Sequence, residues 1–181
     1  MKGKNMKVVI VGGGPAGMLA GISAAKENNE VVILEKMNTI GKKLRITGKG
    51  RCNITNAINI EEFISNIPGN GKFLYSAFQN FTNQDIINLL KKEGLDTKVE
   101  RGNRVFPVTD NAQSVIDALH KALRELKVKI ICNAKVTDLI IENRSYYWRK
   151  LCYTRRKKRN YCRQSSSCNR RDKLSINRFN R

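Results

Sequence analysis

Residues 8–17 read Val8-Val9-Ile10-Val11-Gly12-Gly13-Gly14-Pro15-Ala16-Gly17, and this stretch decides the fold. The apolar, β-branched run predicts a strand, and the Gly-x-Gly-x-x-Gly pattern after it is typical of a strand–turn–helix that holds a dinucleotide. Gly12 permits the tight turn, Gly14 lets a pyrophosphate approach the backbone, and Gly17 lets the helix pack close to the strand. The helix would direct its first N–H groups at the phosphates.

A second apolar run, Val31 to Leu34, ends in Glu35, followed by Lys36. An acid at this distance from the glycines can accept hydrogen bonds from the adenosine ribose hydroxyls. We therefore predict two strands, residues 7–11 and 31–34, joined by a helix, residues 15–27. Parallel strands with a right-handed crossover follow from this order.

The amino-terminal segment has an alternative interpretation as a secretory signal peptide, with Lys2, Lys4 and Lys7 preceding the apolar run. The glycines and Pro15 would weaken such a helix, so we favour the nucleotide-binding interpretation. No other stretch is apolar and long enough to span a bilayer. The sequence thus indicates a cytoplasmic protein with no membrane partner.

Charge and cysteine content give two further constraints. The 181 residues suffice for one domain with a core, and the net charge is +20. Residues 144–181 hold 14 of the 35 Lys and Arg residues, whereas Asp172 is the only acid there. The five cysteines form no Cys-x-x-Cys pair and His120 is the only histidine, so we expect no metal site.

The middle of the chain interrupts the strand–helix alternation. Residues 38–60 form a long basic, glycine-containing stretch, which we interpret as a ligand-binding loop rather than a solvated surface loop.

Pro107 argues against a central strand in the extended segment 104–108. Asp110 and Gln113 suit a capping box. The other predicted elements are helical structure over 61–95 with a stop at Gly94, a helix over 110–126, and strands over 128–132 and 136–141.

These residues resemble those of one family, the YhiN/BaiN-like (aminoacetone-oxidase-like) NAD(P)/FAD-dependent oxidoreductases. The resemblance rests on the glycine motif, on Leu34-Glu35-Lys36, on residues 41–56 and on residues 102–107, and it covers residues 6–143. It implies an α/β fold: a Rossmann-like FAD-binding domain, residues 1–143, with an inserted helical section. The domain would be partial, and residues 144–181 would form a disordered basic tail.

The resemblance also implies which residues bind FAD. The pyrophosphate would be held by Gly12, Gly14, Pro15, Ala16 and Gly17. Glu35 would bind the adenosine ribose, and the backbone of Val136 would meet the adenine. The ribityl and flavin side would be lined by Lys36, Lys43, Gly48, Arg51, Cys52 and Asn53.

The chemistry would belong to the cofactor. No residue is a convincing catalytic acid or base, so the catalytic residues stay unassigned and the flavin would carry the redox step. Cys52 has no partner thiol, which favours a role in loop packing over a redox role. We therefore expect the amino-terminal FAD-binding part of an oxidoreductase that transfers hydride through FAD. NAD(P)H is a candidate electron donor, and the substrate would be a small molecule.

Two alternatives remain open. The first is an NAD-dependent dehydrogenase, in which Glu35 would repel the 2′-phosphate of NADP; the 41–56 loop favours FAD instead. The second is nucleic-acid binding through the tail, where the basic run 155–159 is interleaved with aromatic residues. Such a tail would bind phosphates non-specifically and in a salt-dependent way.

The tail departs from the family pattern after Asn143, because no β-meander and no Ala-Thr-Gly-Gly strand end are visible in it. We interpret it as the product of a frameshift near residue 144. Codons compatible with Cys168 to Arg181, read one base later, encode Ala-Thr-Gly-Gly followed by Ile-Ser-Tyr-Pro. On this interpretation the polypeptide as it stands binds FAD weakly or not at all and is inactive.

The gene sequence tests this interpretation. The shifted reading requires an arginine codon ending in GG, either AGG or CGG, at Arg170 and at Arg171, because the last two bases then begin a glycine codon in the next frame. We expect such a codon at both positions when the gene is sequenced. A codon for Arg170 or Arg171 that ends in A, C or T would contradict the frameshift.

Overall fold

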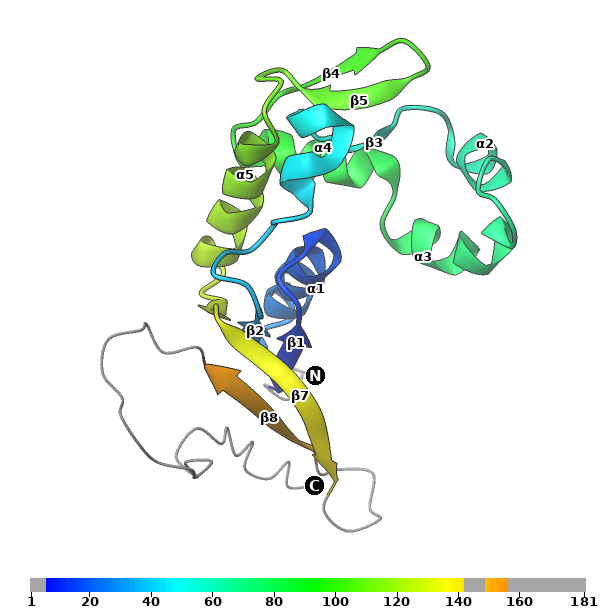
Figure 1. Cartoon of the computed structure of the whole chain (residues 1–181). Helices are drawn as coiled ribbons and strands as arrows, with labels where there is room; N and C mark the ends of the chain where they lie inside the picture. Colours follow the sequence, from blue (N-terminus) through cyan, green and yellow to red (C-terminus); the bar gives the residue numbers. More distant parts are fainter. Residues whose placement is uncertain (1–5, 142–148, 156–181) are drawn as a thin grey trace. The chain divides into compact units, whose positions relative to one another are not determined.

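The computed structural model describes residues 6–141 and 149–155. These residues form two compact units, each considered by itself (Figure 1). The first unit contains the chain up to Ile40 and from Leu123 onward. The second unit is residues 41–122. None of the helices in the described part of the chain is long and apolar enough to cross a membrane.

The first unit is built on a three-stranded parallel sheet with the order β1-β2-β6. These strands are β1 (Lys7–Val11), β2 (Glu30–Leu34) and β6 (Lys129–Ile131). Helix α1 (Pro15–Lys26) connects the first two strands. The predicted strand–helix–strand unit is therefore confirmed, with both neighbours of β2 running parallel to it.

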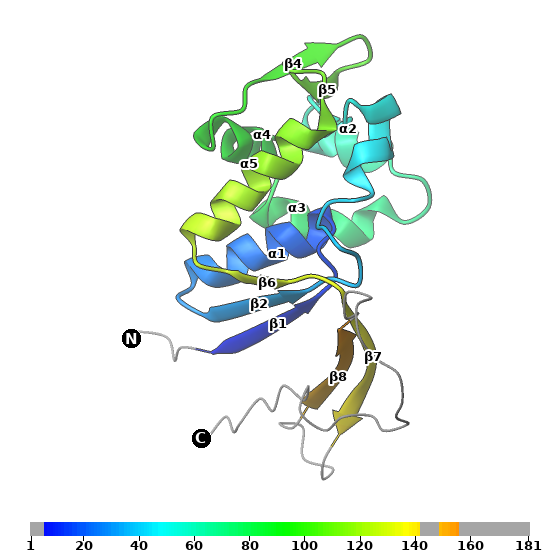
Figure 2. The ribbon, with the colours of Figure 1, turned by 60° about the vertical axis from the view of Figure 1, so that its left-hand side comes forward.

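Helix α1 lies across one face of this sheet (Figure 2). Met18 and Ile22 of α1 are buried, and Ile33 of β2 is fully buried. A Cβ atom at Gly21 would lie 3.0 Å from both Ile33 Cδ1 and Leu123 Cδ2. The small residues of the helix thus permit the close approach that the sequence predicted, and burial of these apolar side chains stabilises the layer.

The glycine turn between β1 and α1 has the backbone geometry that the motif predicts. Gly12 has φ +101°, in the left-handed region, and its N–H donates to the carbonyl oxygen of Leu34 at 2.8 Å. A Cβ atom at Gly17 would overlap the carbonyl oxygen of Gly12. At Gly14, by contrast, a Cβ atom would meet nothing within 4 Å. Among Gly12, Gly14 and Gly17, packing of the protein itself therefore requires a glycine at Gly17.

A β-hairpin completes the first unit. Strands β7 (Ala134–Ile141) and β8 (Arg149–Arg155) pair antiparallel, with a bulge between Val136 and Asp138. Strand β8 lies where the sequence predicted no regular structure. Its pairing supplies partners for the backbone groups of β7, which an isolated strand would leave unsatisfied. The rest of the predicted tail, residues 144–148 and 156–181, lies outside the described residues.

The second unit contains a small antiparallel sheet with the order β3-β5-β4. Its strands are β3 (Thr55–Asn56), β4 (Thr97–Glu100) and β5 (Arg104–Pro107). The prediction that Pro107 excludes a central strand is wrong, because β5 is the middle strand. Pro107 is the last residue of β5 and pairs only with Thr97 of β4, because the pairing between β3 and β5 extends no further than Val105. The missing N–H of the proline therefore removes no hydrogen bond from β3.

The second unit also contains several helices. They are η1 (Leu44–Gly50), α2 (Ile60–Ser65), η2 (Gly71–Leu74), α3 (Tyr75–Asn80), α4 (Asn83–Lys92) and α5 (Ala112–Glu125). Helix α4 begins with a capping box between Thr82 and Asp85 and ends before Gly94, whose φ is +92°. The predicted capping box of α5 is wrong: Asn111 Oδ1, not Asp110, accepts the hydrogen bond from the Gln113 N–H, at 2.8 Å.

The glycine turn generates a prediction about stability. Gly17→Ala places a methyl group against the carbonyl oxygen of Gly12, so the turn or the helix must shift. We expect it to lower the free energy of unfolding of the first unit by about 1–3 kcal/mol, as overpacking typically does. Gly14→Ala is the matched control, with no neighbour to displace. Urea unfolding followed by circular dichroism measures both; equal effects would contradict the assignment.

Candidate nucleotide-binding site

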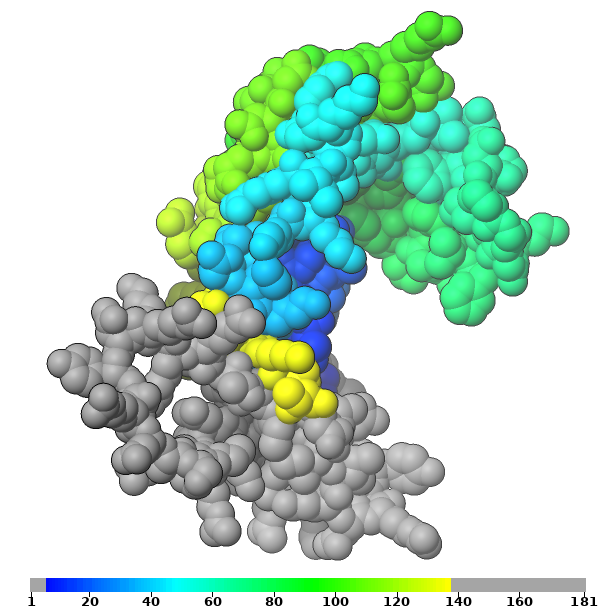
Figure 3. Space-filling model, in the orientation of Figure 1, coloured from blue at the N-terminus to red at the C-terminus, as the bar shows by residue number. Residues whose placement is uncertain are grey.

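A cavity of about 340 Å³ lies where the carboxyl ends of β1 and β2 meet the start of β7. Ligands of open α/β sheets bind at this end of parallel strands. Its lining residues are Val11, Gly12, Leu34, Glu35, Lys36, Ala134, Lys135 and Val136. In Figure 3 the start of β7 (yellow) reaches the surface beside the amino-terminal segment (blue).

The carboxylate of Glu35 is the most firmly held polar group in this cavity. The residue is only 8% exposed. Its Oε2 accepts a hydrogen bond from the Gly13 N–H at 2.6 Å, and its Oε1 accepts one from the Met37 N–H at 2.7 Å. Both donors are backbone groups, so the carboxylate orientation is fixed before any ligand arrives. Each oxygen keeps a further lone pair for hydroxyl donors.

The backbone of Glu35 is held equally well. Its N–H donates to the carbonyl oxygen of Ile131 at 2.9 Å, and its carbonyl oxygen accepts from the Ala134 N–H at 2.8 Å. These two bonds connect the end of β2 to β6 and to the first residue of β7. The acid and the Val136 segment are therefore positioned by one hydrogen-bonded arrangement, although they lie about a hundred residues apart in the chain.

The amino terminus of α1 supplies an anion-binding geometry next to the cavity. Gly14 is the N-cap residue, Pro15 is the first helical residue, and no acidic residue occupies the first turn. The N–H groups of Gly14, Ala16 and Gly17 are those that an α-helix leaves without intrahelical partners. They and the helix dipole favour a negatively charged group at this position.

Two exposed lysines line the cavity, Lys36 and Lys135. Lys36 and Val136 were predicted from the sequence, whereas Lys135 and Ala134 were not. Their position in the sequence could have indicated them, because both come just before Val136 and just after a predicted parallel strand, whose carboxyl end lies at the ligand-binding edge of the sheet. The sequence alone did not reveal that the bonds to Glu35 bring this segment to the cavity.

The remaining predicted cofactor residues lie in the second unit: Lys43, Gly48, Arg51, Cys52 and Asn53. Lys43 and Asn53 are exposed, and Lys43 precedes η1. Gly48 has φ +54°, and a Cβ atom there would lie 2.8 Å from the Asn53 backbone nitrogen. This geometry explains the glycine as a requirement of the loop. A role for these five residues on the flavin side stays a prediction.

Arg51 is engaged within its own unit. Its guanidinium forms ion pairs with Glu100 and Asp110, and lies 4.2 Å from the centroid of the Phe106 ring. Lys98 completes the cluster with a 2.5 Å contact to Asp110. Arg51 therefore fastens the 44–50 loop to the β4–β5 hairpin, a role that its position in the sequence did not reveal.

The thiols of Cys52 and Cys132 have raised pKa values. Cys52 is almost fully buried, and burial raises the pKa of its thiol more than the hydrogen bond from Thr47 lowers it. Burial, with a smaller contribution from the negative charge of Glu35, likewise raises the pKa of Cys132. Neither thiol is activated as a nucleophile. The preference for a packing role at Cys52 agrees with its burial.

The Arg51 cluster generates a prediction about pH. The hydrogen bond from Lys98 and then that from Arg51 hold the pKa of Asp110 below its ordinary value. The ion pairs therefore contribute stability above the ordinary carboxyl pKa, and the contribution is lost as the pH falls through the lowered value. We expect Lys98→Met to raise the pKa of Asp110, and Arg51→Met to raise it less.

Carboxyl ¹³C NMR titration measures this effect. Asp85 serves as an internal control, because the N–H and hydroxyl of Thr82 lower the pKa of its carboxyl independently of the cluster. An unchanged Asp110 pKa in Lys98→Met, or a parallel shift at Asp85, would contradict the assignment.

The sequence of the chain is similar to those of known proteins. The sequence pattern of the HI0933-like protein Rossmann domain matches residues 6–161. The chain is 34% identical over 143 residues to the 3-dehydro-bile acid delta(4,6)-reductase of Clostridium scindens, covering 77% of this chain and 34% of that protein. It is 31% identical over 112 residues to the ribosomal RNA dihydrouridine synthase of Escherichia coli, covering 61% and 27%. The chain thus spans about a third of the length of these relatives.

Solved structures show the same fold at low sequence identity. The 3-ketosteroid-delta4-(5alpha)-dehydrogenase of Rhodococcus jostii matches with a TM-score of 0.58 and 14% identity, covering 84% of this chain and 43% of that one. A flavocytochrome c3 fumarate reductase matches with a TM-score of 0.53 and 22% identity, covering 82% and 30%. Because the family match covers most of its length, the chain belongs to the HI0933-like protein Rossmann domain family.

Proposed function

We propose that the cavity of the first unit binds the adenosine diphosphate half of FAD. The observation that carries this proposal is the Glu35 carboxylate, which two backbone N–H groups hold beside the glycine turn. Its free lone pairs suit the two hydroxyls of a ribose. The pyrophosphate would bind at the start of α1, and the adenine would lie against Val136.

The local geometry fits such a ligand. The space beside Gly14 is open, so a phosphate can approach the backbone where a side chain would otherwise project. The first turn of α1 carries no acid, and Lys36 and Lys135 add positive charge near the cavity. The site would prefer an adenosine without a 2′-phosphate, because the negative charge of Glu35 repels a phosphate on the ribose.

We further propose that this chain is part of a longer protein, because its matches cover only about a third of each relative. That protein would be an oxidoreductase that transfers hydride through FAD to or from a small molecule. A bound flavin supplies the redox chemistry, since no protein side chain accepts hydride. The residues of this chain bind and orient the cofactor. NAD(P)H as electron donor is part of this proposal. The alternative, an NAD-dependent dehydrogenase, differs in which dinucleotide the cavity prefers.

An NMR titration of the full chain with ADP, FAD and NAD⁺ tests the adenosine site. We expect ADP and FAD to shift the amide signals of the 11–17 turn and of Met37, because these groups surround the ligand. Glu35→Gln should weaken ADP binding by roughly tenfold, as expected when a ribose loses its charged acceptor. Gly14→Ala should weaken it while leaving the fold intact, since its methyl group occupies the phosphate space.

Glu27→Gln is the matched control, because Glu27 is an exposed carboxylate at the other end of α1. It should bind ADP like the unaltered chain. Comparison with 2′,5′-ADP measures the selectivity that Glu35 imposes. Equal binding of ADP by all variants would overturn the site, and a preference for NAD⁺ over FAD would favour the dehydrogenase alternative.

A further inference from the structure

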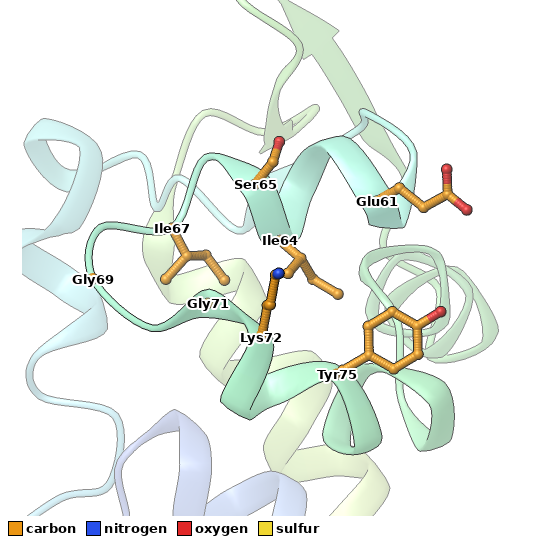
Figure 4. Close-up of a pocket in the computed structure, with 8 residues that line it drawn as sticks. All are labelled: Glu61, Ile64, Ser65, Ile67, Gly69, Gly71, Lys72 and Tyr75. Carbon is orange, nitrogen blue, oxygen red and sulfur yellow. The ribbon is translucent and has the colours of Figure 1, made fainter.

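The second unit contains a hollow that nucleotide binding does not use. Its volume is about 520 Å³, within the range of small-molecule pockets. Residues of α2, of the loop that follows it, of η2 and of the start of α3 line it (Figure 4). All of these residues belong to the second unit, so the hollow is distinct from the adenosine cavity.

The wall of the hollow is mainly apolar. Ile64 is 8% exposed and Ile67 is half-buried, and in Figure 4 their side chains lie on the same side of η2. A Cβ atom at Gly71 would overlap the carbonyl oxygen of Ile64, so η2 packs directly against the end of α2. This backbone contact fixes the shape of the wall without a ligand, which lowers the entropic cost of binding.

The ammonium group of Lys72 adds an unpaired positive charge to the lining of the hollow. The Lys72 side chain projects from η2 and lines the hollow together with Ile64, which it overlaps in the view of Figure 4. None of the carboxylates in the described residues forms an ion pair with it. Glu61 lies at the rim, with its carboxylate pointing away from Ile67. An ammonium beside apolar side chains, without a counter-charge, favours an anionic group on a ligand.

Large aromatic side chains extend the apolar surface of η2 and α3. Phe73 is 81% exposed and Tyr75 is 49% exposed, although both are large enough to bury considerable area. Tyr75 also lines the hollow, where its ring forms one side in Figure 4. A ligand with an apolar body would remove part of this surface from water.

We propose that this hollow binds a small amphipathic anion. Its apolar body would lie against Ile64, Ile67 and the ring of Tyr75, and its carboxylate or sulfonate would pair with Lys72. The high positive charge of the chain, +20 overall, favours association of such an anion over that of a cation. The proposal is independent of the adenosine site.

Fluorescence titration with 1-anilinonaphthalene-8-sulfonate tests the proposal on the full chain. N-phenyl-1-naphthylamine, which has the same rings without the sulfonate, is the neutral counterpart. We expect saturable binding of the sulfonate that Lys72→Met weakens about fivefold, the size expected for a partly exposed ion pair. The neutral probe should bind the variant and the unaltered chain alike. The control variant Lys92→Met removes the same charge from an exposed lysine of α4 and should change the affinity for neither probe.

The position of the probe is checked by NMR. Shifts of amide signals confined to residues 60–75, which persist with ADP in excess, would support the assignment. Shifts at the 11–17 turn, or displacement by ADP, would place the probe in the other cavity and overturn the proposal. Lack of saturable binding would also overturn it, as would equal losses of affinity in Lys72→Met and Lys92→Met.

Discussion

The first unit depends on the set of hydrogen bonds that surrounds Glu35. Its carboxylate joins the glycine turn to the residues after β2, and its backbone joins β2 to β6 and β7. A buried carboxylate is costly unless such donors satisfy it, and here each oxygen has a backbone donor. The same bonds that relieve this cost bring distant segments together around one cavity. Binding geometry and local stability therefore have a common origin in one side chain.

The glycine motif illustrates how one short pattern combines two requirements. Gly17 is needed for packing within the protein, whereas Gly14 leaves room for a ligand. Gly12 differs again, because its positive φ is a property of the backbone path. The roles of Gly12 and Gly17 could be predicted because each follows from the absence of a side chain, which is visible in the sequence itself. The role of Gly14 at a pyrophosphate stays a prediction.

The parts that sequence reasoning missed depend on contacts between distant segments. Apolar periodicity located β1, α1 and β2, but it gave no sign that Lys135 lines the cavity, since that depends on the bond between Ala134 and Glu35. The resemblance placed Arg51 on the flavin side, but it gave no indication of the partners of its guanidinium, which are acids about fifty residues away in the chain. Local rules misassigned the cap of α5 for the same reason, because Asp110 pairs with Arg51 and Lys98.

The parallel sheet has a consequence for handling the protein. Its outer strands β1 and β6 each have a neighbour on one side only among the described strands of that sheet. An open edge of β-branched residues is a template on which another copy can add a strand. Val8, Val9 and Ile10 of β1 are half-buried rather than covered, and Lys7 is the one charged residue of that strand. In concentrated solutions we therefore expect chains to associate edge to edge. Repulsion between the like-charged chains opposes this association, and because salt screens that repulsion, low ionic strength should keep the chains apart best.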